Sequence, residues 1–128
     1  MGFKQINPNP NKLFVGDCAV RAVSTVLGIS WDEAFLDICA QGFIIKDMPS
    51  SDAVWGTYLK TKGFTQHTIQ AGCEFCYTLR DFCKDHPEGS YVVATGTHAV
   101  SVIDGDYLDT ADCGDCIPIY YFRKEEER

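Results

Sequence analysis

The fold of this chain is set first by the stretch of sequence around Cys18, which reads Val15-Gly16-Asp17-Cys18-Ala19-Val20-Arg21-Ala22. Apolar residues recur from Ala19 to Leu27 at the spacing of an amphipathic helix, which predicts a helix from about Asp17 to Leu27. Cys18 lies in the first turn, at the edge of the buried stripe. Free backbone N–H groups and the positive end of the helix dipole favour a thiolate there. Cys18 is therefore a candidate nucleophile.

Three more helices are predicted downstream by capping signals and by the same apolar period. Ser30-Trp31-Asp32-Glu33 is a capping box for a second helix, which we expect to reach about Ala40 and to stop at Gly42. A third helix is expected from Ser50 or Ser51 to just before Gly63, and a fourth from about Cys73 to Lys84. Residues 1–16 are rich in turn signals and are expected to form an irregular arm.

The period changes from 3.6 to 2 in the last third of the chain. Strands are expected at residues 91–94, 98–103, 106–110 and 117–122, with Asp104-Gly105 as the strongest hairpin turn. Helices followed by an antiparallel meander predict an α+β fold, in which N-terminal helices pack on a C-terminal antiparallel sheet. We find no linker or repeat, so residues 1–128 are expected to form a single domain.

Composition excludes several classes of function. The net charge is −7 and the eleven Lys and Arg residues are scattered, which disfavours nucleic-acid binding. No apolar run approaches the roughly 18 residues of a membrane helix, and the N-terminus lacks the apolar core of a signal peptide. Seven cysteines, an odd number, fit a reducing compartment better than a disulfide framework. We therefore expect a cytoplasmic protein with no membrane partner.

A thiolate nucleophile needs a base, and His98 is the best placed of the three histidines because it opens a strand. If Asp104-Gly105 is a two-residue type I′ turn, Ile103 pairs with Asp106. His98 and Asp109 are then diagonal neighbours on one face of the hairpin. Asp106 and Asp112 have the wrong parity to reach His98. Asp109 is thus predicted to orient His98, although capping of a turn is the alternative role.

These segments resemble the small papain-like cysteine peptidases encoded by bacteria and their phages. The matching pieces are Gly16-Asp17-Cys18-Ala19-Val20-Arg21-Ala22, Gly96-Thr97-His98-Ala99-Val100 and the hairpin from Val102 to Thr110. The resemblance implies a papain-like fold with catalytic Cys18, His98 and Asp109. It also implies a cysteine-dependent peptidase or amidase that cleaves an amide bond of a peptide or other substrate through an acyl-enzyme, without a cofactor.

One position departs from that family pattern. Papain-like enzymes usually carry a Gln about six residues before the nucleophile, where its amide helps to bind the oxyanion. Lys12 occupies that offset here and Asn11 lies one residue earlier. Asn11 is the chemically closer replacement, because its side chain is also an amide.

Two alternatives to a peptidase remain open at the level of the sequence. An NlpC-type cell-wall amidase also begins its helix with Asp-Cys, although no export signal is visible. A catalytically silent papain-like module could instead serve as a binding scaffold, because a fold does not establish activity.

The remaining cysteines divide into core positions and two paired motifs. Cys39 and Cys83 fall on apolar helix stripes and are expected to be small core residues. The paired motifs are Cys73-Glu74-Phe75-Cys76 and Cys113-Gly114-Asp115-Cys116. Together they could supply a tetrathiolate zinc site that would staple a scaffold. Their separation is longer than common zinc-ribbon spacing, so we expect no bound metal.

Overall fold

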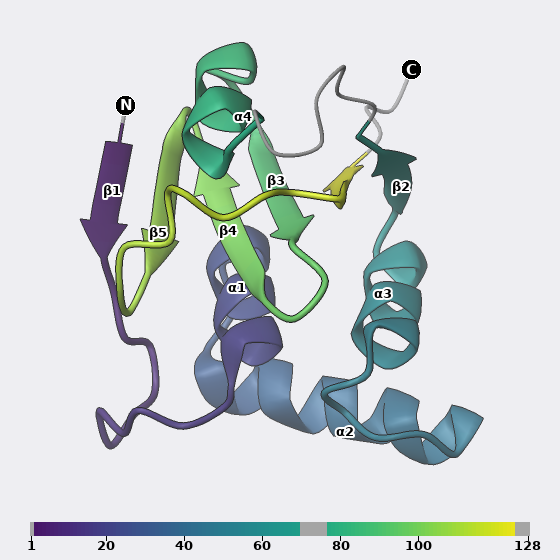
Figure 1. The fold of residues 1–128 in the computed structure, drawn as a ribbon. Helices are drawn as coiled ribbons and strands as arrows, with labels where there is room; N and C mark the ends of the chain where they lie inside the picture. Colours follow the sequence, from purple (N-terminus) through teal and green to yellow (C-terminus); the bar gives the residue numbers. More distant parts are fainter. Residues whose placement is uncertain (1, 70–76, 125–128) are drawn as a thin grey trace.

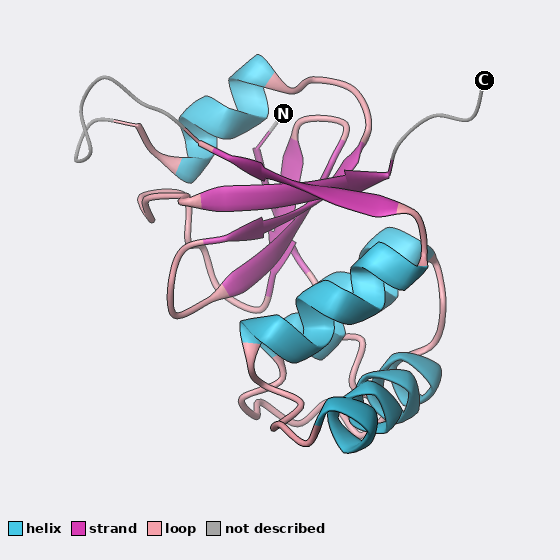
Figure 2. Cartoon of the chain, turned by 90° about the vertical axis from the view of Figure 1, so that its right-hand side faces the viewer, coloured by secondary structure: helices cyan, strands magenta, loops and turns pink. Residues whose placement is uncertain are grey.

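The computed structural model describes residues 2–69 and 77–124. Its six-stranded sheet lies between two layers of helices, with α1 (Cys18–Leu27), α2 (Trp31–Ile45) and α3 (Asp52–Thr61) on one side. The short helix α4 (Leu79–Asp85) covers the opposite side, as Figures 1 and 2 show. The expected α+β class is confirmed. No helix in the described ranges is long and apolar enough to cross a membrane.

The helices begin where the sequence places their caps. The Ser30 hydroxyl accepts a hydrogen bond from the Glu33 N–H, and Ser51 caps α3 through the N–H of Ala53. Thr78 and Asp81 form a reciprocal capping box at the start of α4. The predicted start of this helix at Cys73 lies outside the described residues, and Tyr77 and Thr78 precede the helix.

Gly42 does not end α2, which continues to Ile45, so this boundary was predicted wrongly. The glycine is buried in the helix, and a Cβ atom at this position would lie 2.7 Å from the carbonyl oxygen of Asp47. Gly42 is thus required by the close approach of the following loop and not by a helix end. Lys46, in the left-handed conformation, ends the helix instead.

The sheet contains two strands that the sequence analysis did not predict. β1 (Gly2–Gln5) lies in the segment expected to be irregular and pairs in parallel with β5 (Asp106–Asp109). β2 (Phe64–Thr68) pairs with β6 (Tyr120–Lys124) at the other edge. With β3 (Ser90–Ala94) and β4 (Ala99–Ile103), the order is β1-β5-β4-β3-β6-β2. The sheet is therefore mixed, and not purely antiparallel and C-terminal as predicted.

Alternation along β3 divides the core into two clusters. Val92 and Ala94 pack with the apolar faces of α1, α2 and α3. Tyr91 and Val93 belong to the second cluster, which contains Phe82 and Leu79 of α4. Apolar residues on both faces of one strand explain why this sheet is covered by helices on both sides.

The β4–β5 hairpin has the predicted turn and register. Asp104 and Gly105 both have positive φ angles, 50° and 83°, which is the pattern of a type I′ turn. Ile103 pairs with Asp106, and Ser101 pairs with Leu108. This register places His98 and Asp109 at the open end of the hairpin, next to α1.

Candidate active site

Cys18 is the first residue of α1, and Asp17 occupies the N-cap position. The Asp17 side chain makes no capping hydrogen bond, because its carboxylate is held by other side chains described below. The backbone N–H groups of the first turn have no partner within the helix. The thiol therefore lies at the positive end of a helix whose first turn is not capped by a side chain.

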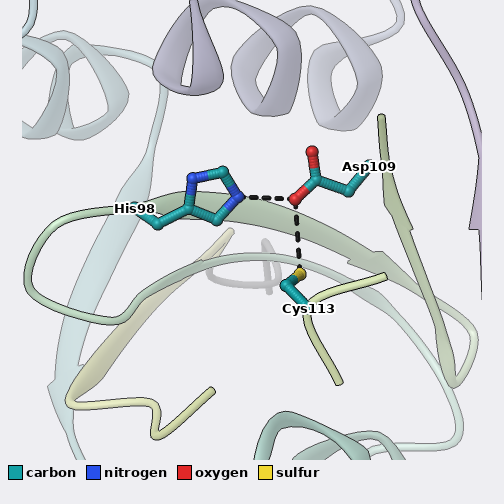
Figure 3. A group of neighbouring side chains, drawn as sticks. All are labelled: His98, Asp109 and Cys113. Carbon is teal, nitrogen blue, oxygen red and sulfur yellow. Dashed lines mark hydrogen bonds and ion pairs between the residues drawn. The ribbon is translucent and has the colours of Figure 1, made fainter. Parts of the chain in front are cut away.

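His98 connects Cys18 to Asp109. Its Nε2 atom lies 2.5 Å from Oδ2 of Asp109, and Figure 3 shows the second ring nitrogen on the side that faces α1. The side chain of His98 is also hydrogen-bonded to Cys18. The structure thus brings together the three residues that sequence analysis selected, from the start of α1, the residue before β4 and the end of β5.

The environment of His98 favours the imidazolium form. The hydrogen bond to Asp109 is the main cause that raises the pKa of His98 to about 12. Hydrogen bonds with Cys113 and Cys18 act in the same direction, and burial opposes them. A protonated ring can donate from both nitrogens at once.

The same contacts favour the thiolate form of Cys18. Burial is the largest single influence on the pKa of Cys18 and acts to raise it. Together, the hydrogen bond from His98, a backbone hydrogen bond from Ala99 and the charges of His98 and Arg21 outweigh burial. The pKa of Cys18 is therefore lowered below its ordinary value, and both shifts favour a thiolate beside an imidazolium.

Asp109 is almost completely buried, and a chain of buried charges supports it. Its Oδ1 atom accepts a hydrogen bond of 2.9 Å from Arg21 and one of 2.7 Å from the Thr110 N–H. Burial acts to raise the pKa of Asp109, but the hydrogen bonds from His98 and Thr110 lower it to about 2. Asp109 is thus an acceptor for both His98 and Arg21.

Arg21 also forms an ion pair with Asp17, whose second carboxylate oxygen accepts a 2.8 Å hydrogen bond from the Trp31 indole. We call Trp31, Asp17, Arg21 and Asp109 the buried polar chain. Sequence analysis quoted Arg21 without giving it a role. The i, i+4 spacing of Asp17 and Arg21 was the available signal, but such a spacing usually marks an exposed pair.

Cys113 is a second thiol at this site. Its Sγ atom donates to Oδ2 of Asp109 at 3.3 Å (Figure 3). Burial raises the pKa of Cys113, and Asp109 adds to that effect, although the hydrogen bond with His98 opposes it. Of the two thiols that contact His98, only Cys18 is therefore shifted toward the thiolate.

In the described part of the chain, His98, Asp109 and Cys113 form a group of three side chains that could hold a metal ion. One ligand atom from each lies within 4.8 Å of the others. Nitrogen, oxygen and sulfur donors in such a group suit Zn²⁺. Sequence analysis considered Cys113 only together with Cys116, Cys73 and Cys76. Cys73 and Cys76 lie outside the described residues, and Cys116 lies in a turn closed by its N–H and the Cys113 carbonyl.

Asn11 lies exposed in the segment before α1, and its backbone N–H donates to the side chain of Asn9. Its role at the oxyanion stays a prediction.

Among the other histidines, His67 lies on β2, at the far edge of the sheet from the β4–β5 hairpin, and His86 follows α4. Neither belongs to the site.

An apolar pocket of about 300 Å³ adjoins the first turn of α1. It is lined by residues 15–20, by Trp31 and Phe35 of α2, and by Pro49 and Ser50. Cys18 is one of the lining residues, so the pocket and the candidate nucleophile share a wall.

Comparison with known proteins identifies no relative of this chain: no family model matches it, and no curated protein or solved structure shows significant similarity to it.

Proposed function

We propose that this protein is a cysteine-dependent hydrolase that cleaves an amide bond through an acyl-enzyme on Cys18. The observation that carries the proposal is the contact of Cys18, at an uncapped helix N-terminus, with a histidine held by a buried aspartate. The order of nucleophile, base and acid along the chain resembles that of papain-like peptidases. We extend the proposal to a papain-like arrangement of the site.

In the proposed reaction, the Cys18 thiolate attacks the carbonyl carbon of the substrate, and an S–C bond forms. As the tetrahedral intermediate collapses, the C–N bond breaks and the His98 imidazolium gives its proton to the leaving amine. Water then attacks the thioester while His98 takes a proton from it. The S–C bond breaks, and the carboxylic acid product and the thiolate are released. Asp109 acts as a positioning residue throughout, because it touches only His98 among the reacting groups.

Two features support stabilisation of the oxyanion. The Cys18 N–H lies at the helix N-terminus, where it can donate to an oxygen that becomes negative during attack. Because the Asp17 carboxylate is engaged by Arg21 and Trp31, it does not compete for these backbone groups. We propose the Cys18 N–H as one oxyanion donor and Asn11 as the candidate for the second.

A zinc-containing scaffold is the second candidate function. It is favoured by the position of Cys113, which places a sulfur ligand beside His98 and Asp109. A metal ion on Nε2 of His98 would displace the hydrogen bond to Asp109 and leave a binding module without a catalytic base. An NlpC-type amidase would use the same residues as the peptidase, and it differs in hydrolysing cell-wall peptides in preference to general peptide substrates.

The proposal can be tested with an activated ester, p-nitrophenyl acetate, in a rapid-quench experiment. We expect an acetyl group to accumulate on Cys18, located by peptide mass spectrometry, and multiple turnovers per chain. Cys18→Ala should abolish both signals, because the other thiol that contacts His98 in the described part of the chain, Cys113, has a raised pKa. Cys113→Ala is the matched control, since it removes the other thiol that contacts His98 and should leave acetylation of Cys18 intact.

Acetylation spread over several cysteines, or turnover that survives Cys18→Ala, would refute the proposal. Acetylation concentrated on Cys113 would point to a different nucleophile. Release of p-nitrophenol without a cysteine adduct would indicate adventitious hydrolysis by surface groups.

A further inference from the structure

The apolar pocket beside Cys18 has the construction of a binding site. Its polar members, Asp17 and Ser50, are outnumbered by aliphatic, aromatic and proline side chains. A volume of about 300 Å³ is at the lower end of the range for small-molecule sites and suits one large side chain. Water in such a space makes few hydrogen bonds, so an apolar group gains free energy by replacing it.

The pocket wall is fixed to the candidate nucleophile. The rings of Trp31 and Phe35 stack in parallel, with centroids 5.0 Å apart and an interplanar angle of 9°. The Trp31 indole donates to Asp17, which immediately precedes Cys18. The pocket is thus held in place by the buried polar chain that also supports Asp109.

The charge at the pocket is already compensated. The Asp17 carboxylate pairs with Arg21 and accepts from Trp31, so it is not available to bind a cationic group of a ligand. Apolar surface also continues along the chain, because Leu13, Phe14 and Val15 are all at least 49% exposed. Consecutive exposed apolar residues next to a pocket are typical of a binding surface.

We propose that this pocket binds a large apolar group, aromatic or branched aliphatic, next to the cleaved amide bond. The inference rests on the proposed function. It follows from the position of the acyl carbon, which must lie at the Cys18 sulfur with its oxygen near the helix N-terminus. A substituent of that carbon then lies within reach of the space between residues 15–20 and the start of α2. The substrate class is thus an amide that carries a large apolar group next to the cleaved bond.

The test compares two alkylating reagents that carry the same reactive group, iodoacetamide and N-benzyliodoacetamide. The rate of Cys18 labelling by each is measured by peptide mass spectrometry, and their ratio cancels changes in thiolate content. We expect the benzyl reagent to react about tenfold faster or more, since burial of a few methylene equivalents gives discrimination of this order. The same ratio at partly exposed Cys116, which lies outside the pocket, provides the reference within each sample.

Two variants of α2 locate the effect. Phe35→Ala removes a pocket wall and should bring the ratio at Cys18 close to one. Phe43→Ala is the matched control, because Phe43 lies on the same helix, is 74% exposed and does not line the pocket. The rate with iodoacetamide should stay unchanged in Phe43→Ala, because Phe43 lies outside the pocket, whereas Phe35→Ala is judged by the ratio of the two rates, which cancels any change in the reactivity of Cys18.

The outcomes separate the two proposals. If Cys18 reacts fast with iodoacetamide but shows no preference for the benzyl reagent, the pocket inference is wrong and the hydrolase proposal stands. An equal loss of preference in Phe35→Ala and Phe43→Ala would also overturn the pocket inference. If Cys18 reacts no faster than the other cysteines with either reagent, both proposals fail.

Discussion

Replacing Arg21 with Met should destabilise the protein strongly, because Arg21 is the only cation between two buried carboxylates in the described structure. Its side chain is 8% exposed, and those of its partners Asp17 and Asp109 are 5% and 4% exposed. Methionine retains an unbranched apolar stem like the aliphatic part of arginine, so the change removes charge and hydrogen bonds more than packing.

The magnitude follows from what each carboxylate retains. The 2.9 Å contact of Arg21 with Asp109 corresponds to a gross attraction of about 6 kcal/mol at an effective dielectric of 20. Desolvation offsets much of this attraction in the folded protein, but removing one partner leaves the other charge buried, which costs about 3–5 kcal/mol. Asp109 keeps the His98 imidazolium, whereas Asp17 keeps only the Trp31 indole. We therefore expect Arg21→Met to lower the free energy of unfolding by about 3 kcal/mol, near the lower end of this range, mainly because the Asp17 carboxylate loses its partner.

Urea denaturation at pH 7, followed by circular dichroism, measures this loss. Arg80→Met is the matched control, because Arg80 pairs with Asp112 and Asp115 on the surface and its removal should leave the midpoint close to that of the wild type. Adding Asp17→Asn to Arg21→Met should recover part of the stability, since it neutralises the abandoned carboxylate. If Arg21→Met shifts the urea midpoint as little as Arg80→Met does, the reasoning is refuted.

Three further predictions concern the site itself. Asp109→Ala should lower the pKa of His98 and move the alkylation profile of Cys18 to higher pH, by about tenfold in rate at neutral pH for each unit of pKa change, whereas Asp112→Ala should behave like the wild type. The pKa of Asp109 is depressed to about 2 from 3.8, so its contribution to stability is present above pH 3.8 and lost as the pH falls through 2. When the free energy of unfolding is measured against pH, its decrease in acid should be about 2 kcal/mol smaller in Asp109→Asn than in the wild type. Protein purified without chelator should contain well below one zinc per chain by elemental analysis, and a stoichiometric zinc that is lost in Cys113→Ala would instead favour the scaffold.

The elements predicted best from sequence are those determined by local signals. The stripe from Ala19 to Leu27 and the serine caps of α2 and α3 depend on neighbouring residues, and they placed the starts of these helices to within one or two residues. Asp104-Gly105 fixed the hairpin register through turn geometry alone. The contact between His98 and Asp109 could be predicted because both lie on that hairpin.

The features that were missed depend on partners distant in the chain. β1 is a short edge strand whose partner β5 lies about a hundred residues later in the chain. Its sequence lacks the alternation of apolar and polar residues that would predict a strand. Arg21 reaches Asp109 across 88 positions, and Cys113 reaches it through a loop whose path no local pattern predicts. Proximity of this kind is created by tertiary packing, so the sequence could name the members of the site but not its supporting charges.

The two-residue turn between β4 and β5 also limits how this protein can vary in length. Exposed loop tips usually accept inserted residues without harm. Here, one residue added between Gly105 and Asp109 must either be expelled as a bulge or turn the Asp109 carboxylate to the opposite face of the sheet. A single-codon insertion or deletion in the hairpin that is not taken up as a bulge would separate Asp109 from His98. The spacing of eleven positions between His98 and Asp109 is therefore as constrained as the identity of the two side chains.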